Sequence, residues 1–219
     1  MASSNFNELQ VYETLSKVVP ILNTHRISYW FEGSIIPTSA NGFLYRKVND
    51  LDILIDKDKA DTFTQELKKI GYKQKDKNIY RVSEHVGVRV FIHKSLLEIG
   101  YFSISISKSG PYEIKAGPLR ITISRSVLTK TGYQFNDIDF IGIPLEGAYT
   151  FALLSKGNPK RVHEFELYER LKIKPFKWPI YDLYLWGVKC NWLIDLLNIS
   201  LITLGKVRVW FRKPYDPWR

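Results

Sequence analysis

The residues best suited to chemistry are Asp50 and Asp52, which enclose Leu51 in an aliphatic run that continues to Ile55. Residues two apart in a β-strand point to the same face, so both carboxylates should project together while Leu51, Ile53 and Ile55 pack on the other face. Two like charges about 6–7 Å apart repel each other unless a cation lies between them. Carboxylate oxygens suit Mg²⁺ or Mn²⁺. The pattern predicts a divalent-cation site, and an exposed strand face is the alternative that it leaves open.

A second group of residues could bind an anion. Gly33 and Ser34 follow a short aromatic strand predicted over 28–32. A Gly-Ser turn lets the backbone approach a phosphate closely, with N–H groups and a hydroxyl as donors. Arg46 lies four residues before Asp50 and could neutralise an anionic substrate or pair with an aspartate. Taken singly, Gly33-Ser34 is explained by an ordinary turn and Arg46 by a surface charge.

Taken together, the pieces resemble the nucleotidyltransferase superfamily, which has the polymerase-β-like fold. The shared pattern is a strand, Gly33-Ser34, a connection over 35–49 that carries Arg46, and Asp50-Leu51-Asp52 in a second strand. The arginine four residues before the first aspartate is similar to the form found in minimal, toxin-type and drug-modifying nucleotidyltransferases.

The resemblance implies a metal-dependent transfer of a nucleoside monophosphate from an NTP, with ATP as the expected donor, and release of pyrophosphate. The acceptor would be a hydroxyl of RNA or of a small molecule. Gly33, Ser34 and Arg46 would bind the nucleotide. Asp50 and Asp52 would be the catalytic residues and would bind Mg²⁺ or Mn²⁺.

A later basic segment contains Lys156, Lys160 and Arg161. It resembles the basic helical region that often follows the sheet in this superfamily, which implies contacts with the triphosphate or the acceptor. The residues alone are explained by a solvated helix face.

The chain departs from the family pattern at the third carboxylate, which usually lies on a neighbouring strand. The strand predicted over 86–93 is the candidate neighbour, and the expected position reads Phe91. Other acidic residues could substitute, and spacing selects none of them: Glu98, Glu113, Asp137 and Asp139. The alternative function is therefore a catalytically inactive protein of this fold that binds nucleotide or nucleic acid.

The order of elements predicts an α+β fold, with a mixed sheet flanked by helices and a mainly helical C-terminal part. Helices are expected over 7–23, 58–70, 145–154, 161–171 and 180–204. Strands are expected over 28–32, 51–55, 72–75, 79–83, 86–93, 99–107, 120–125 and 136–143. We place the boundary between a nucleotidyltransferase-like domain, 1–143, and a helical region with a basic aromatic tail, 144–219.

The composition bounds the remaining possibilities. The 219 residues include 32 Lys and Arg against 22 Asp and Glu, a net charge of +10 that favours polyanions such as nucleotides or RNA. A solvated basic surface explains the same charge. The single cysteine, Cys190, excludes an intramolecular disulfide. The sequence has no secretory signal and no apolar segment suited to crossing a membrane, so we expect a cytoplasmic protein. The oligomeric state stays open.

Overall fold

The computed structural model describes residues 7–75, 88–106, 110–116, 119–153, 161–177 and 181–192. The helical elements are α1 (Glu8–Thr24), α2 (Ile35–Asn41), the 3₁₀ turn η1 (Lys57–Lys59), α3 (Ala60–Lys69), α5 (Leu145–Leu153) and α6 (Val162–Arg170). The strands are β1 (Tyr29–Glu32), β2 (Asp50–Asp56), β3 (Lys73–Gln74), β4 (Val88–Ile92), β5 (Glu98–Ile104), β6 (Tyr112–Ala116), β7 (Leu119–Ile123), β8 (Thr131–Phe135), β9 (Ile138–Gly142), β10 (Tyr181–Leu185) and β11 (Val188–Lys189).

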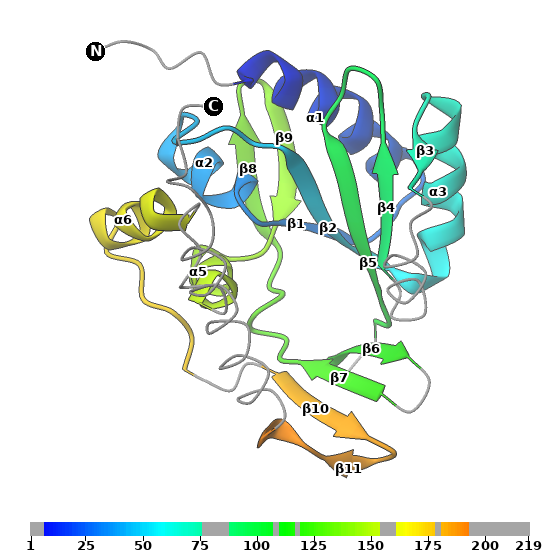
Figure 1. Ribbon diagram of the computed structural model, residues 1–219, viewed down its shortest axis with the longest axis vertical. Helices are drawn as coiled ribbons and strands as arrows, with labels where there is room; N and C mark the ends of the chain where they lie inside the picture. The colour runs from blue at the N-terminus through cyan, green and yellow to red at the C-terminus, as the bar shows by residue number, and fades with distance from the viewer. Residues whose placement is uncertain are drawn as a thin grey trace, which may run out of the picture.

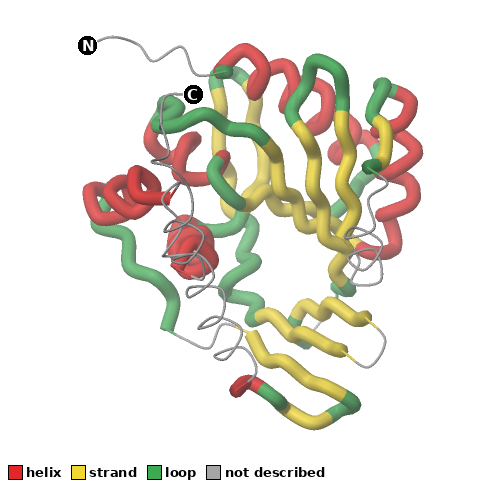
Figure 2. Tube along the Cα trace, in the orientation of Figure 1, coloured by secondary structure: helices red, strands yellow, loops and turns green. Residues whose placement is uncertain are grey.

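Within these residues the strands form two sheets, which Figures 1 and 2 show one below the other. The larger sheet has seven strands in the order β3-β4-β5-β2-β1-β9-β8, and the smaller has four in the order β11-β10-β7-β6. The larger sheet is mixed, because β2 runs antiparallel to β1 and parallel to β5. This confirms the expected α+β fold with a mixed sheet.

The centre of the larger sheet is built from the two strands that the sequence analysis singled out. In β2, Leu51, Ile53 and Ile55 are fully buried, whereas Asp50 is exposed and Asp52 is half-buried. The alternation is the one expected for a strand with one apolar face and one carboxylate face. Helices α1 and α3 contact each other, and α2, α5 and α6 form a second helical group beside β8 (Figure 1). No helix of the described residues is long and apolar enough to cross a membrane.

Polar side chains in α1 and directly before it hold the segments that lead into β2 and β5. The amide of Asn7 donates to the carbonyl of Val48 (2.6 Å), and its oxygen accepts from the Val48 N–H (3.2 Å). The buried hydroxyl of Thr14 accepts from the N–H of Leu97 (3.0 Å). Val48 lies two residues before Asp50 and Leu97 lies directly before Glu98, so α1 fixes the starts of both strands.

The helix expected over 180–204 is wrong where the structure describes it. Residues 181–189 instead form the hairpin β10–β11, and β10 pairs with β7 along its whole length. Trp186 and Gly187 make the turn, with φ of 48° and 81°, and two successive positive φ values are typical of a tight hairpin turn. The second sheet thus joins strands from both sides of residue 143, and the division into two domains stays a prediction.

Candidate active site

Three carboxylates lie at the starts of two neighbouring parallel strands. Asp50 opens β2 and Glu98 opens β5, and the two residues are register partners. Asp52 follows on the same face of β2. Glu98 therefore occupies the place beside the aspartates that the sequence analysis assigned to strand 86–93, and that assignment is wrong. The strand β4 is separated from β2 by β5, and Phe91 on β4 pairs with Ile99 and is fully buried.

Two glycines lie next to the carboxylate of Asp52, one on each side of it. A Cβ at Gly33 would lie 3.2 Å from Oδ2, and a Cβ at Gly100 would lie 3.0 Å from Oδ1. Gly33 also has φ +72°, a conformation that L side chains rarely adopt. Gly33 thus allows both the turn out of β1 and the approach of Asp52. Gly100 was missed from the sequence, although it lies two residues after Glu98 and hence on the same face of β5.

A fourth carboxylate, Glu32, adjoins the site because it is the register partner of Asp52 on β1. Burial, and then the charge of Asp52, raise the pKa of Glu32. Burial, and then the charge of Asp50, raise the pKa of Asp52, and Glu98 adds to that effect. Each shift has the sign expected for crowded carboxylates in a partly dehydrated site. A bound cation would offset this repulsion.

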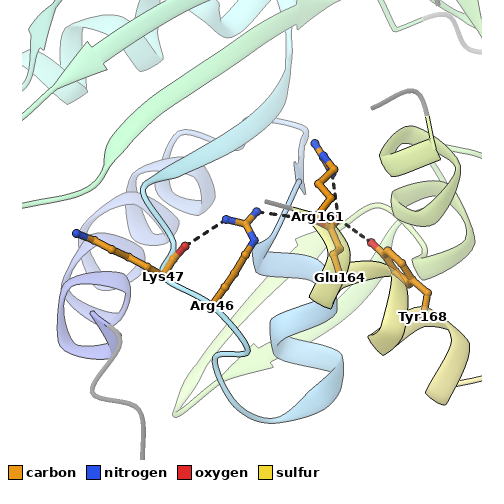
Figure 3. Close-up of polar contacts among 5 residues, drawn as sticks. All are labelled: Arg46, Lys47, Arg161, Glu164 and Tyr168. Atoms are coloured by element: carbon orange, nitrogen blue, oxygen red, sulfur yellow. Dashed lines mark hydrogen bonds and ion pairs between the residues drawn. The ribbon is translucent and has the colours of Figure 1, made fainter. Parts of the chain in front are cut away.

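Arginine side chains supply the opposite charge. Arg46 and Arg161 both lower the pKa of Asp52, so their positive charges act on the carboxylate group. Figure 3 shows both arginines directed at Glu164 of α6, where their dashed contacts meet that of Tyr168. Arg161 Nη1 donates to Glu164 Oε1 at 3.1 Å, and Arg46 Nη2 lies 3.9 Å from Oε2. The structure thus brings Arg161 next to a site whose other residues lie more than sixty positions earlier in the sequence.

The other predicted residues fall into three groups. Ser34 is buried at the start of α2, and its hydroxyl has no hydrogen-bond partner among the described residues. Lys156 and Lys160 lie outside the described residues. The remaining candidates for the third carboxylate lie elsewhere: Glu113 lies 3.7 Å from Arg120 in the smaller sheet, and Asp137 and Asp139 are exposed on the β8–β9 hairpin.

The fit of the site to a metal ion can be tested on its carboxylates. In the part of the chain that is described, no group of three or more His, Cys, Asp or Glu residues could by itself hold a metal ion. Glu98 Oε2 is engaged by Lys75 Nζ at 2.6 Å. Mg²⁺, however, is commonly held by one or two carboxylates together with substrate phosphates and water. Asp50 and Asp52 fit that kind of site.

Comparisons with known proteins concern the family and the fold of the chain. Residues 14–118 match the family model of aminoglycoside-2''-adenylyltransferase. The crystal structure of the lincosamide antibiotic adenylyltransferase LnuA, with lincomycin bound, is similar at a TM-score of 0.59 and 17% identity, covering 73% of this chain and 95% of that one. The solution structure of the antibiotic-resistance factor ANT(2'')-Ia is similar at a TM-score of 0.54 and 12% identity, covering 90% of this chain and 91% of that one. No curated protein matches the chain by sequence.

The fold is that of known nucleotidyltransferase structures, and the family match points to the same class of protein. The family match over residues 14–118 and the similar structures together support the nucleotidyltransferase superfamily, and the matched proteins are of its drug-modifying type. The resemblance drawn from Gly33-Ser34, Arg46 and Asp50-Leu51-Asp52 is thereby confirmed at the level of the superfamily.

Proposed function

We propose that this chain transfers AMP from ATP to a hydroxyl group of a small molecule of the antibiotic class. The observation that carries the proposal is the convergence of Asp50, Asp52 and Glu98 at the starts of β2 and β5. Arg46 and Arg161 lie within electrostatic reach of Asp52. The carboxylates would bind a cation, and the neighbouring arginines would bind a polyphosphate.

The roles follow from what each side chain can reach. Asp50 and Asp52 would hold Mg²⁺ or Mn²⁺, which when bound supplies electrostatic stabilisation of the charge on the phosphates. Gly33 and the unpartnered hydroxyl of Ser34 would receive the β- and γ-phosphates. Arg46 and Arg161 would neutralise the triphosphate, for which planar guanidinium groups are well suited.

The transfer is an in-line displacement at the α-phosphorus. The acceptor oxygen forms a bond to that phosphorus, the bond to the oxygen bridging the α- and β-phosphates breaks, and pyrophosphate leaves with that oxygen. The acceptor hydroxyl loses its proton in the same process. Glu98 is the candidate to receive it, because one of its oxygens pairs with Lys75 and the other has no hydrogen bond from a described residue.

The comparisons favour a small-molecule acceptor over RNA. The family match concerns an aminoglycoside adenylyltransferase. A crystal structure of ANT(2'')-Ia in complex with adenylyl-2''-tobramycin is similar at a TM-score of 0.53 and 11% identity, covering 89% of this chain and 95% of that one. These names motivate a hydroxylated antibiotic as the first acceptor class to test. The net charge of +10 keeps RNA as the second.

The proposed transfer is tested by comparing substitutions at two Asp-x-Asp pairs of this chain, Asp50/Asp52 and Asp137/Asp139. Wild type, Asp50→Asn/Asp52→Asn and the control Asp137→Asn/Asp139→Asn are incubated with MgATP and a panel of aminoglycosides, lincosamides and tRNA. AMP-modified product is detected by mass spectrometry and pyrophosphate by a coupled assay. We expect modification of a small molecule by wild type and the control, and none by the Asp50/Asp52 variant.

Each other result has a definite meaning. Equal transfer by all three proteins would refute the assigned roles of Asp50 and Asp52. Modification of tRNA alone would move the acceptor to RNA. Calorimetric binding of MgATP without transfer to any acceptor would favour the alternative function, an inactive nucleotidyltransferase fold that binds nucleotide.

A further inference from the structure

Glu164 is a carboxylate that the proposed reaction does not use directly. Its side chain is only 1% exposed, and it lies in α6, which packs against α2. Oε1 accepts hydrogen bonds from Arg161 Nη1 (3.1 Å) and from the hydroxyl of Tyr168 (3.3 Å). Oε2 faces Arg46 Nη2 at 3.9 Å. One buried carboxylate is thus shared by two arginines from segments more than a hundred residues apart in the chain.

The contacts of Arg46 are incomplete. Its Nη1 donates to the carbonyl of Lys47 (3.2 Å). Its Nε, Oε2 of Glu164 and the hydroxyl of Tyr45 are all buried and have no hydrogen-bond partner among the described residues. Buried polar groups in folded proteins normally have partners, so a cluster of exceptions requires an explanation. A group that must stay free to reach a ligand is one such explanation.

The two arginines face a competing attraction. Both act on Asp52, and Arg161 also acts on Glu32. Yet among the described residues neither guanidinium forms an ion pair with Asp50 or Asp52, and both pair with Glu164 instead. A guanidinium that collapsed onto Asp52 would neutralise the carboxylate needed for a cation and would itself be lost to the phosphates. The pairs with Glu164 would hold both cations beside the carboxylates and oppose that collapse.

We infer that Glu164 is a positioning residue that orients Arg46 and Arg161 as a pair toward the polyphosphate of the nucleotide, an inference that rests on the proposed function. Glu164 would act without touching the nucleotide or the reacting atoms. Its effect on binding passes through the two arginines, so removing the carboxylate should matter only while those arginines are present.

The experiment uses Glu164→Gln with a matched control on the same helix. Glu166→Gln removes the same charge from an exposed pair, in which Glu166 Oε2 lies 3.1 Å from His163 Nδ1. Calorimetry measures binding of MgATP and of inorganic tripolyphosphate. Because a hydrogen bond between charged groups typically contributes a factor of roughly ten or more in affinity, we expect about tenfold weaker binding of both by Glu164→Gln. Glu166→Gln should bind as wild type.

A double-mutant cycle separates positioning from general stability. Glu164→Gln is combined with Arg46→Ala/Arg161→Ala, and we expect no further loss of affinity in that background. A further loss as large as in wild type would overturn the inference, as would wild-type affinity of Glu164→Gln itself. If Glu164→Gln does not fold, Glu164→Asp retains the charge but is too short to reach both arginines. Weakened tripolyphosphate binding by that variant supports the inference, and unchanged binding overturns it.

The binding data also show whether the role of Glu164 or the proposed function has failed. If wild type binds neither MgATP nor tripolyphosphate, the proposed function itself fails. If wild type binds both and Glu164→Gln binds equally well, the proposed function stands and only the role of Glu164 is refuted.

Discussion

Gly100→Ala should impair transfer without unfolding the protein. The new Cβ would lie 3.0 Å from Asp52 Oδ1, so the carboxylate must move by a few tenths of an ångström. Gly100 does not have a positive φ, so the substitution introduces no backbone strain. Alanine in a strand also restricts the unfolded chain, which stabilises a protein by roughly 0.4–1 kcal/mol and offsets part of the crowding.

The expected loss of transfer rate follows from the displacement of the Asp52 carboxylate. A misplacement of about 1 Å near the reacting atoms costs roughly a hundredfold in rate, so a shift of ~0.4 Å corresponds to roughly sixfold, or about 1 kcal/mol in the barrier. Asp52 would also carry the charge that holds the cation. We therefore expect kcat/KM to fall by roughly fivefold to twentyfold, with a larger part of the loss in kcat.

The matched control is Gly132→Ala in β8, where an added Cβ would meet no atom within 4 Å. Both variants are assayed for AMP transfer and for thermal unfolding. Gly132→Ala should leave transfer unchanged. If Gly100→Ala transfers AMP at the wild-type rate while its Tm is also unchanged, the orientation of Asp52 is irrelevant and the assignment of the site is refuted.

Two further predictions concern the same carboxylate. Gly33→Ala combines a positive φ of 72° with a contact of 3.2 Å to Asp52 Oδ2, so it should lose transfer and also about 1–2 kcal/mol of stability, measured by urea unfolding. A stable, active variant would contradict this. Asp52→Asn should be more stable than wild type at about pH 8 without divalent cations, by on the order of 1–2 kcal/mol. Because the folded-state pKa of Asp52 is raised from 3.8 to about 7, wild type loses stability as the pH rises through that interval, and the gain of Asp52→Asn should vanish below the ordinary value. A gain that grew as the pH fell would contradict the sign of the shift.

The central strands could be predicted because their signals are local. The alternation in β2 placed Asp50 and Asp52 on one face, and Gly33 ended β1 as expected. Strands β6 and β8 and the hairpin β10–β11 were not predicted, since their aliphatic and aromatic patterns also suit other structures. The partner of Asp50 could not be found locally either, because strand order in the sheet depends on contacts far apart in the sequence.

The same limit explains why Glu98 and Glu164 could not be assigned from spacing. Glu98 was one of several acidic candidates, and only its register with Asp50 separates it from the others. Glu164 carries no motif by itself. Its position between Arg46 and Arg161 appears only when α6 packs on α2, which joins the two halves of the chain.

The raised pKa values at this site imply that the fold retains these carboxylates at a cost in stability. Neutral residues in place of Glu32 and Asp52 would increase the stability of the fold, because burial and mutual repulsion disfavour both charges. Perturbed carboxylates of this kind gather where a ligand compensates them. Nearby arginines offset only part of the repulsion, since both are already engaged with Glu164. A cation on the aspartates and a polyphosphate on the arginines would together neutralise both groups, which is the charge pattern of a metal-bound NTP.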